Sequence, residues 1–158
     1  MNDEARMDGD FRIRPLEPAD LEHLWTMQWD PLPRQIRTFY LLCTLAHPRY
    51  CSVAIDRAGR IVGVMLASTD EPGQWAYVNI LRIEPDCRGT GLGAEMMKRL
   101  ESQCRSAGIG RIWLLTSTDI EPFYERLGYT RDNSFMPAVT RRLMVEYRPD
   151  TLVLAKVL

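Results

Sequence analysis

Residues 78–107, VNILRIEPDCRGTGLGAEMMKRLESQCRSA, contain the pattern that decides the fold of this chain. The stretch begins with an apolar run, residues 78–83, which is typical of a β-strand and is interrupted only by Asn79 and Arg82. A glycine-rich turn at 88–94 follows and leads into an amphipathic helix. Backbone N–H groups converge at such a turn and the helix dipole adds positive charge, so we expect an anion, a pyrophosphate, to bind there.

Glycine motifs of three kinds compete for this turn. A P-loop needs Lys-Ser or Lys-Thr after its last glycine, and Ala94-Glu95 stands there instead. The dinucleotide-binding pattern G-x-G-x-x-A is met by Gly89, Gly91 and Ala94. In that motif the strand runs almost directly into the first glycine, whereas here residues 84–88 intervene, and too little chain follows for a doubly wound domain. The sequence therefore argues against both of these nucleotide-binding folds.

The third motif is Arg-x-x-Gly-x-Gly, which Arg88, Gly91 and Gly93 satisfy after an Ile-x-Pro sequence. It resembles the coenzyme A pyrophosphate loop of the GNAT superfamily of N-acetyltransferases. Residues 123–129, FYERLGY, are similar to a second signature of that family, a Tyr on a short helix followed by Gly and an aromatic residue. Each motif alone is weak, but their order and separation suit the family, and the resemblance extends over residues 11–158.

The composition bounds the class of protein. The chain has 158 residues, of which 46% are hydrophobic and 26% charged, which is ordinary for a globular protein with a proper core. Its net charge of -1 gives no electrostatic case for binding nucleic acid or a membrane surface, and no apolar run is long enough to span a bilayer. We expect a single domain at 11–158, preceded by a mobile tail at 1–10.

The cysteines and histidines predict no metal site. Cys43, Cys51, Cys87 and Cys104 have no metal-ligand spacing, and both histidines lie far from any cysteine pair. Cys87 stands beside Arg88, which would favour the thiolate, but no recognisable motif pairs it with a His, so a nucleophilic role is disfavoured. We expect reduced thiols in a cytoplasmic protein.

Hydrophobic periodicity predicts an α/β (α+β) fold. Strands are expected at 11–14, 50–55, 60–68, 75–83, 111–116 and 151–158, and helices at 18–29, 36–43, 92–107 and 120–127. Helices follow some strands but not all, so we expect a mixed sheet rather than a purely parallel one. The resemblance implies that this sheet is GNAT-like and mostly antiparallel, with about six to seven strands flanked by about four helices. For 131–150 a helix and a strand pairing with 151–158 both fit; we favour a strand near Tyr129, then a loop or helix.

The helix after the glycine turn has one apolar face. The residues expected to be buried are Leu92, Met96, Met97, Leu100 and Cys104. Two i, i+4 pairs, Glu95/Arg99 and Glu101/Arg105, are expected in solvent, and Gly108 is expected to end the helix.

The resemblance implies which residues bind acetyl-CoA. In this family the strand before the loop splays from its neighbour, which frees main-chain groups of residues 81–83 for the pantetheine arm and the oxyanion. Many members carry an Asn seven residues before the signature Tyr, and Ser117 stands at that position. The expected cofactor-binding residues are Leu81, Arg82, Ile83, Arg88, Gly89, Thr90, Gly91, Leu92, Gly93, Ala94 and Ser117.

The resemblance also implies that Tyr124 is the general acid that protonates the leaving thiolate. The general base cannot be identified, because the strand before the loop contains no carboxylate or His. Asn79, on the face that alternation assigns to Tyr77 and Leu81, is a candidate for positioning a water, and Glu84 is the nearest acid. A base acting through water, or an amine that arrives neutral, would leave no trace in the sequence.

In this family the loop between the first two helices often edges the acceptor site, which makes Trp29 and Asp30 acceptor-site candidates. Asn79 is a further acceptor-site candidate because of its place on the strand before the glycine turn, and residues 131–150 are the other candidate wall. The sequence predicts an acetyl-CoA-dependent N-acetyltransferase that acts on a primary amine by direct attack in a ternary complex. A small metabolite is the favoured acceptor, because the chain has no extra recognition domain; a protein N-terminus or lysine stays open, and so does the oligomeric state, a homodimer included. The alternatives are a non-catalytic acyl-CoA-binding module, a thioesterase-like hydrolase and, more distantly, an NAD(H)-dependent oxidoreductase.

Overall fold

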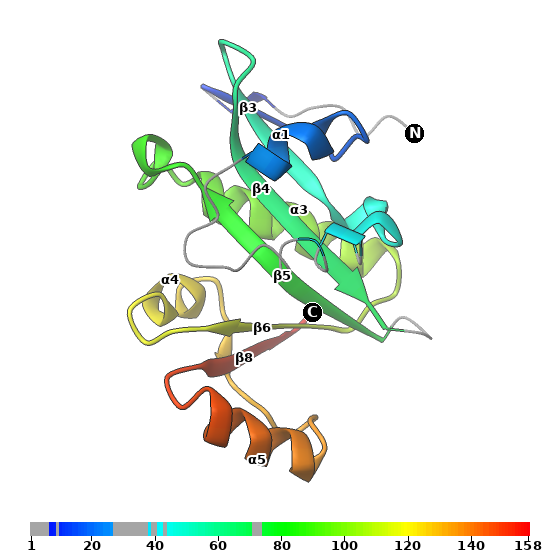
Figure 1. Ribbon diagram of the computed structural model, residues 1–158, viewed down its shortest axis with the longest axis vertical. Coiled ribbons are helices and arrows are strands. Elements are labelled where there is room, and N and C mark those ends of the chain that lie inside the picture. The colour runs from blue at the N-terminus through cyan, green and yellow to red at the C-terminus, as the bar shows by residue number, and fades with distance from the viewer. Residues whose placement is uncertain (1–6, 9, 27–37, 39–40, 43, 71–73) are drawn as a thin grey trace.

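The computed structural model describes residues 7–8, 10–26, 38, 41–42, 44–70 and 74–158, which form one sheet with the strand order β1-β2-β3-β4-β5-β6-β8-β7 (Figure 1). The strands are β1 (Met7–Asp8), β2 (Phe11–Pro15), β3 (Ser52–Asp56), β4 (Ile61–Thr69), β5 (Trp75–Ile83), β6 (Arg111–Thr116), β7 (Thr130–Arg131) and β8 (Leu152–Val157). The helices are α1 (Asp20–Thr26), α3 (Leu92–Ser106), α4 (Glu121–Glu125) and α5 (Ala138–Tyr147), with short 3₁₀ turns η1 (Pro48–Tyr50) and η2 (Pro85–Cys87).

The expected mixed, mostly antiparallel sheet is confirmed. β5 and β6 run parallel, and the other neighbouring strands are antiparallel. The six longer strands expected from the pattern are present, together with two strands of two residues each: β1, near the start of the chain, and β7, the strand expected near Tyr129. After β7 the structure has α5, so the favoured order of a strand near Tyr129 and then a loop or helix is confirmed, with a helix in that place, and the alternative of a strand just before β8 is wrong. The helix expected at 36–43 lies mostly outside the described residues.

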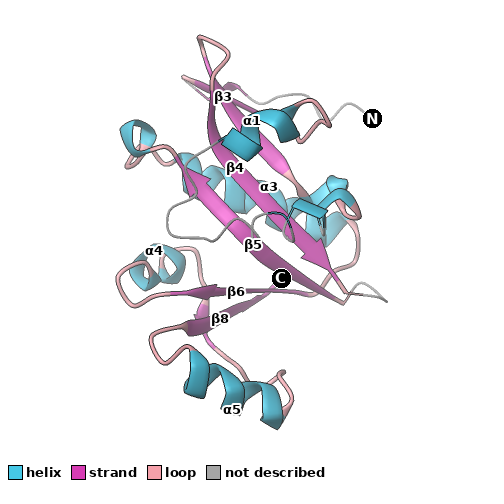
Figure 2. Ribbon diagram, in the orientation of Figure 1, coloured by secondary structure: helices cyan, strands magenta, loops and turns pink. Residues whose placement is uncertain are grey.

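The sheet has a helix layer on each face (Figure 2). On one face α3 packs against the sheet, in a core that includes Met96, Leu100 and Leu114. On the opposite face Leu24 of α1 packs with Val64 of β4. All the residues expected on the apolar face of α3 are buried, which confirms the helical periodicity. No helix in the described part of the chain is long and apolar enough to cross a membrane.

Glu101 on α3 is buried, so its expected place in solvent is wrong: only 4% of the residue is exposed. Its carboxylate accepts hydrogen bonds from Lys156 Nζ on β8 at 2.9 and 2.8 Å and from the Tyr129 hydroxyl at 3.2 Å. Arg105 Nη2 lies 3.4 Å from the same carboxylate. Lys156 also donates to the carbonyl oxygen of Leu127, just after α4, at 2.6 Å. Because a buried charge needs such partners, this network joins α3 to β8 and to the end of α4.

β5 contains one extra residue relative to β4. Leu66 pairs with Ile80 and Ala67 pairs with Val78, so Asn79 has no opposite residue in β4. This is a β-bulge, and an extra residue reverses the face of the sheet to which each later side chain points.

The bulge changes the faces that simple alternation assigns. Val78, before the bulge, belongs to the core under α3, whereas Ile80 belongs to the core under α1 and Leu81 packs against the core under α3. The expectation that Asn79 shares one face with both Tyr77 and Leu81 is therefore wrong, because the extra residue moves Leu81 to the face of α3.

β5 and β6 separate just beyond the bulge. Their parallel register runs from the pair Trp75–Arg111 to the pair Val78–Leu114 and ends there. Figure 1 shows the two strands close together where they begin and diverging towards α4. The resemblance implied such a splay, and it leaves the second half of β5 without a ladder on the side of β6.

Candidate active site

A cavity of about 810 Å³ lies along the opening between β5 and β6. Its described walls come from β5, the glycine turn, the start of α3, β6 and α4. Leu81 and Leu114 line it from the face of α3, and Ile80 lines it from the opposite face. The cavity therefore reaches both faces of the sheet through the gap between the two strands.

Most of the residues implied by the resemblance lie together at this cavity. Those on its wall are Asn79, Leu81, Arg82, Ile83, Arg88, Gly89, Gly91, Leu92, Gly93, Ala94 and Tyr124. Thr90 and Ser117 are not part of the described wall. Trp29 and Asp30, the other acceptor-site candidates, lie outside the described residues.

The glycine turn leaves the N-terminus of α3 open. Gly89 and Gly91 have φ values of 76° and 86°, a left-handed conformation that residues with a Cβ rarely adopt. Gly91 is the N-cap of α3, and no side chain caps the helix. The first N–H groups of this 15-residue helix are therefore available to a ligand, and the helix dipole favours negative charge there. The turn fits a phosphate or pyrophosphate group.

Gly93 allows α3 and α4 to approach each other closely. A Cβ added at Gly93 would lie 3.3 Å from Phe123 Cζ on α4 and 3.6 Å from Ile83 Cγ1 on β5. The first distance is tighter than most contacts that a Cβ makes, so a larger residue would push α4 away from the turn.

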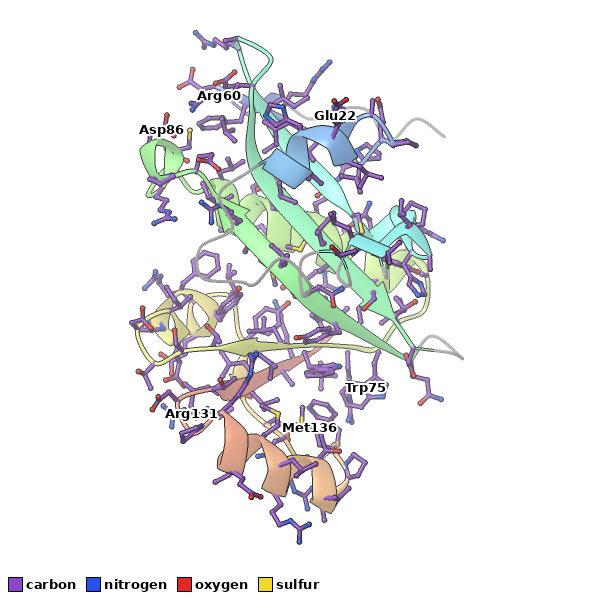
Figure 3. All side chains as sticks on the ribbon, in the orientation of Figure 1. Glu22, Arg60, Trp75, Asp86, Arg131 and Met136 are labelled. Carbon is purple, nitrogen blue, oxygen red and sulfur yellow. The ribbon has the colours of Figure 1, made fainter. Side chains whose placement is uncertain are left out.

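Two arginines hold the entry to the turn. Arg60 Nη2 donates to Asp86 Oδ2 of η2 at 2.7 Å, at the end of the molecule where Figure 3 labels both residues. This hydrogen bond holds the pKa of the Asp86 carboxyl below its usual value. Arg88 Nε donates to the carbonyl oxygen of Ile83 at 3.1 Å. These contacts fix η2 and the start of the turn relative to the sheet.

The hydroxyl groups of two residues expected to bind the cofactor form local hydrogen bonds. Thr90 Oγ1 donates to the carbonyl oxygen of Cys87 at 2.8 Å. The Ser117 hydroxyl donates to the carboxylate of Asp119. Short-range bonds of this kind are common for Ser and Thr in turns.

Tyr124 is buried but borders the cavity. It is 7% exposed, and burial raises the pKa of its phenol to about 12. Its ring makes edge contacts with Phe123 and Tyr129, with centroids 4.9 and 5.9 Å apart. The phenol therefore stays protonated at neutral pH, as a group that donates a proton must.

α4, which carries Tyr124, is held at both ends. Glu121, at its start, forms an ion pair with Arg131 of β7 in which Nη2 and Oε2 are 2.6 Å apart. Hydrogen bonds from Arg131 hold the pKa of the Glu121 carboxyl below its usual value. At the other end, Lys156 bonds to the carbonyl oxygen of Leu127. The position of the phenol thus depends on contacts that reach beyond the helix itself.

The sequence pattern did not indicate some residues of the wall, notably Phe123 and Arg126 of α4. The contact of Phe123 with Gly93 arises only after folding, so the sequence could not indicate it. An Arg at the end of a short helix has no distinguishing signal in the sequence. Cys87 lies on the wall, but burial and a hydrogen bond to Asp86 raise the pKa of its thiol, contrary to an activated thiolate.

Residues 131–150 do not contribute to the described wall. From this segment Phe135 packs on Trp75 and Trp113, with ring centroids 4.6 and 5.3 Å apart. Among the described His, Cys, Asp and Glu residues, no group of three or more could hold a metal ion.

Comparison with known proteins identifies the family. The model of the "Acetyltransferase (GNAT) family" matches residues 12–129. The uncharacterized N-acetyltransferase ycf52 of Porphyra purpurea is 38% identical over 77 residues, which are 49% of this chain and 44% of that protein. The IAA acetyltransferase of Azospirillum brasilense is 27% identical over 149 residues, 92% of this chain and 81% of that protein. This chain thus aligns with less than half of the Porphyra protein but with most of the Azospirillum protein.

A solved structure shares the fold. Arabidopsis thaliana Naa50, in complex with the bisubstrate analogue CoA-Ac-MVNAL, has a TM-score of 0.74 at 17% identity, and the match covers 94% of this chain and 99% of that one. The family model spans well over half of the chain, and the open N-terminus of α3 fits the phosphates of the family's cofactor. The chain therefore belongs to the GNAT family of acetyltransferases, with acetyl-CoA as its co-substrate.

Proposed function

We propose that this enzyme transfers an acetyl group from acetyl-CoA to the primary amine of a small metabolite, by direct attack in a ternary complex. One observation carries the proposal: a single cavity connects the open N-terminus of α3, the buried phenol of Tyr124 and the opposite face of the sheet. Two substrates can therefore approach one point from two sides, which direct transfer requires.

On the cofactor side, the turn at 88–94 would hold the pyrophosphate, and main-chain groups of residues 81–83 would bind the pantetheine arm. The end of the β5–β6 ladder at Val78 supports this role, because the later main-chain groups of β5 have no partner in β6. Acetyl-CoA supplies an activated acetyl thioester, so the protein needs only to orient it and to stabilise the charge that develops.

Tyr124 would provide the proton for the leaving thiolate. The pKa of about 12 that burial imposes keeps the proton on its hydroxyl until it is needed. Its place on the cavity wall and the anchoring of α4 at both ends support a fixed position for that proton.

The acceptor amine would lose its proton to water or arrive neutral. None of the described residues of the wall is Asp, Glu or His, so no direct base is at hand there. Asn79 donates through Nδ2 to Ser68 Oγ at 3.1 Å, which leaves its carbonyl oxygen to accept from a water or from the amine itself.

The experiment that tests this function is a thermal-shift titration with acetyl-CoA, with NAD(H) and ATP alongside. A ligand at 100 times its Kd stabilises a protein by about 2.7 kcal/mol, which raises Tm by about 5–10 °C in a chain of this size. Release of coenzyme A thiol is then measured across a panel of primary amines. A shift with acetyl-CoA alone and amine-dependent thiol release are expected; a shift with NAD(H) alone would refute the proposal.

The second candidate is an acyl-CoA-binding module without turnover, and the lack of a carboxylate or His on the described wall favours it. It predicts the same thermal shift with no thiol release for any amine. Thiol release that is independent of amine would instead indicate a thioesterase-like activity.

We also propose that residues 11–158 act as one domain in a reducing compartment such as the cytoplasm. The free, buried thiols of Cys51, Cys87 and Cys104 support this, because none of them forms a disulfide.

A further inference from the structure

We infer that the acceptor is an amine that also carries a carboxylate, and that the guanidinium of Arg82 binds this carboxylate. The inference rests on the proposed function and adds the chemical class of the acceptor. It assigns to the side chain of Arg82 a role distinct from that of its main chain.

The side chain of Arg82 points to the face of the sheet opposite α3. Arg82 pairs with Val64, which belongs to the core under α1. Its neighbours Leu81 and Ile83 pack against the core under α3, on the side of the glycine turn. The bulge at Asn79 causes this arrangement, because Arg82 would face α3 if Asn79 were paired with β4 as an ordinary strand residue. The main chain at Arg82 can therefore serve one substrate while its side chain serves the other.

The guanidinium of Arg82 is largely buried, and one of its N–H groups lacks a hydrogen-bond partner among the described residues. The side chain is 18% exposed, and its Nε is buried with no hydrogen-bond partner among the described residues. The nearest described acid is Glu84, whose Oε1 lies 3.6 Å from Nε, beyond hydrogen-bonding distance. A buried donor without an acceptor is costly, so this group favours a ligand that supplies one.

The charges around the cavity support an anionic ligand on this side. Three arginines, Arg82, Arg88 and Arg126, line its described wall, and no acid does. Arg88 follows η2 at the glycine turn, and Arg126 ends α4, which contacts α3 through Phe123 and Gly93. These two lie on the cofactor side, whereas Arg82 faces the side from which the acceptor would come.

A carboxylate is the anion that fits best. The planar guanidinium of Arg presents paired N–H donors that match the two oxygens of a carboxylate. The acceptor is an amine, so a small molecule that carries both groups, such as an amino acid, fills both requirements. A neutral alkyl- or arylamine would offer the guanidinium of Arg82 no negative charge.

The test compares amino acids with their carboxamides as acceptors, using steady-state kinetics on the full chain. The carboxamide keeps the primary amine but has no negative charge. Its amine is also less basic, so a preference for the acid cannot come from a larger neutral fraction. We expect the wild-type protein to prefer the acid by at least tenfold in kcat/KM, mainly through KM. Arg82→Gln should abolish the preference, and Arg82→Lys should restore part of it.

Arg88→Gln is the matched control, because it removes an arginine from the cofactor side of the same cavity. It should raise the KM for acetyl-CoA and keep the preference for the acid. A wild-type protein that acetylates acids and carboxamides equally well overturns the inference, and so does an Arg82→Gln variant that keeps the preference. Should Arg82→Gln fail to fold, the wild-type comparison and Arg82→Lys decide the question.

Failure of the proposed function is recognised separately. A protein that binds acetyl-CoA but releases no thiol with any amine is not a transferase under these conditions. Calorimetry of the coenzyme A-bound protein with the same acids and carboxamides then decides: binding of acids only, lost in Arg82→Gln, supports the role of Arg82. Equal binding of acids and carboxamides, or no binding of either, refutes it.

Discussion

The two strands that border the cavity are supported in different ways. β5 is paired with β4 from the Thr69–Ala76 pair to the Gly63–Ile83 pair, with one bulge, and it leads directly into the cofactor turn. β6 is joined to β5 only as far as Val78. On the far side of the gap, α4 and β8 are held to α3 by side chains: Tyr124 and Tyr129 pack in the core under α3, and Lys156 bonds to Glu101 and to the carbonyl oxygen of Leu127.

This difference shows how a gap can be kept open inside a sheet. Backbone hydrogen bonds between β5 and β6 would close the gap, so the ladder ends where the gap begins, at Val78. Beyond that point, side-chain contacts hold the far wall in place. The wall of β5 is therefore fixed by its ladder, whereas the wall of α4, with the phenol of Tyr124, is fixed by side-chain packing and a few charged groups.

The largest effect on stability should come from removing the ion pair between Lys156 and Glu101. Lys156→Met leaves Glu101 buried without its main partner and removes the bond to Leu127, so we expect a loss of about 3–5 kcal/mol in the free energy of unfolding. Urea denaturation measures it. Arg105→Met is the control: this side chain pairs with the same carboxylate but is 52% exposed, and its loss should cost less than about 1 kcal/mol. Equal losses in the two variants would mean that the network does not tie the walls together.

Removing only the phenol hydroxyl of Tyr124 should lower the rate of catalysis without changing the packing around the ring. Tyr124→Phe keeps the ring and its contacts with Phe123 and Tyr129, so we expect kcat to fall by about 100-fold while the Kd for acetyl-CoA stays nearly constant. Stopped assays of thiol release and calorimetry give the two values. Tyr129→Phe, which removes a hydroxyl bonded to Glu101, should lower stability with little change in kcat. Unchanged turnover in Tyr124→Phe would remove this residue from the mechanism.

A change in the glycine turn that follows β5 should act through the backbone conformation. In Gly91→Ala the new Cβ meets no atom within 4 Å, but φ is +86°, so we expect a cost of about 1–2 kcal/mol and weaker binding of acetyl-CoA. Gly110→Ala is the matched control, because its Cβ also meets nothing and its φ is not positive. Thermal denaturation and calorimetry compare them. If the two variants behave alike, the left-handed turn is not what shapes the phosphate site.

The smallest effect concerns the pH dependence of stability. The phenol of Tyr124 ionises at about 12 in the folded protein, and at about 10 when unfolded. Because the folded pKa is raised, its contribution is complete below pH 10 and is lost as the pH rises towards 12. At pH 11 the wild-type protein should lose about 1 kcal/mol more than Tyr124→Phe, relative to pH 8. Identical pH profiles would mean that the cavity admits enough water to keep the phenol solvated.

Local patterns predicted the parts of the fold that local forces decide. The spacing of Met96, Met97 and Leu100 identified α3, because one apolar stripe at helical period is enough to define a buried face. The glycines at 89 and 91 identified the turn, because only their backbone tolerates its φ values. Both signals lie within a few residues of the structure that they specify.

The bulge and the buried network could not be predicted in this way. Around Asn79 the strand is apolar on both faces, so alternation gives no sign of an extra residue. Glu101 looked like half of a solvent pair, because its partner Lys156 is 55 residues away and the contact exists only after folding. In the site, Thr90 was among the residues expected to bind the cofactor, and nothing in the sequence indicated that its hydroxyl bonds to the carbonyl oxygen of Cys87.

The bulge at Asn79 also gives β5 one residue more than its ladder with β4 uses. Deleting Asn79 would let Val78 and Ile80 follow each other opposite Ala67 and Leu66, so every later residue would keep its present partner and face. Arg82 would stay opposite Val64, and Leu81 opposite Met65. When relatives are aligned, a one-residue gap at this position therefore marks the loss of the bulge and not a change in the faces of the residues that follow it.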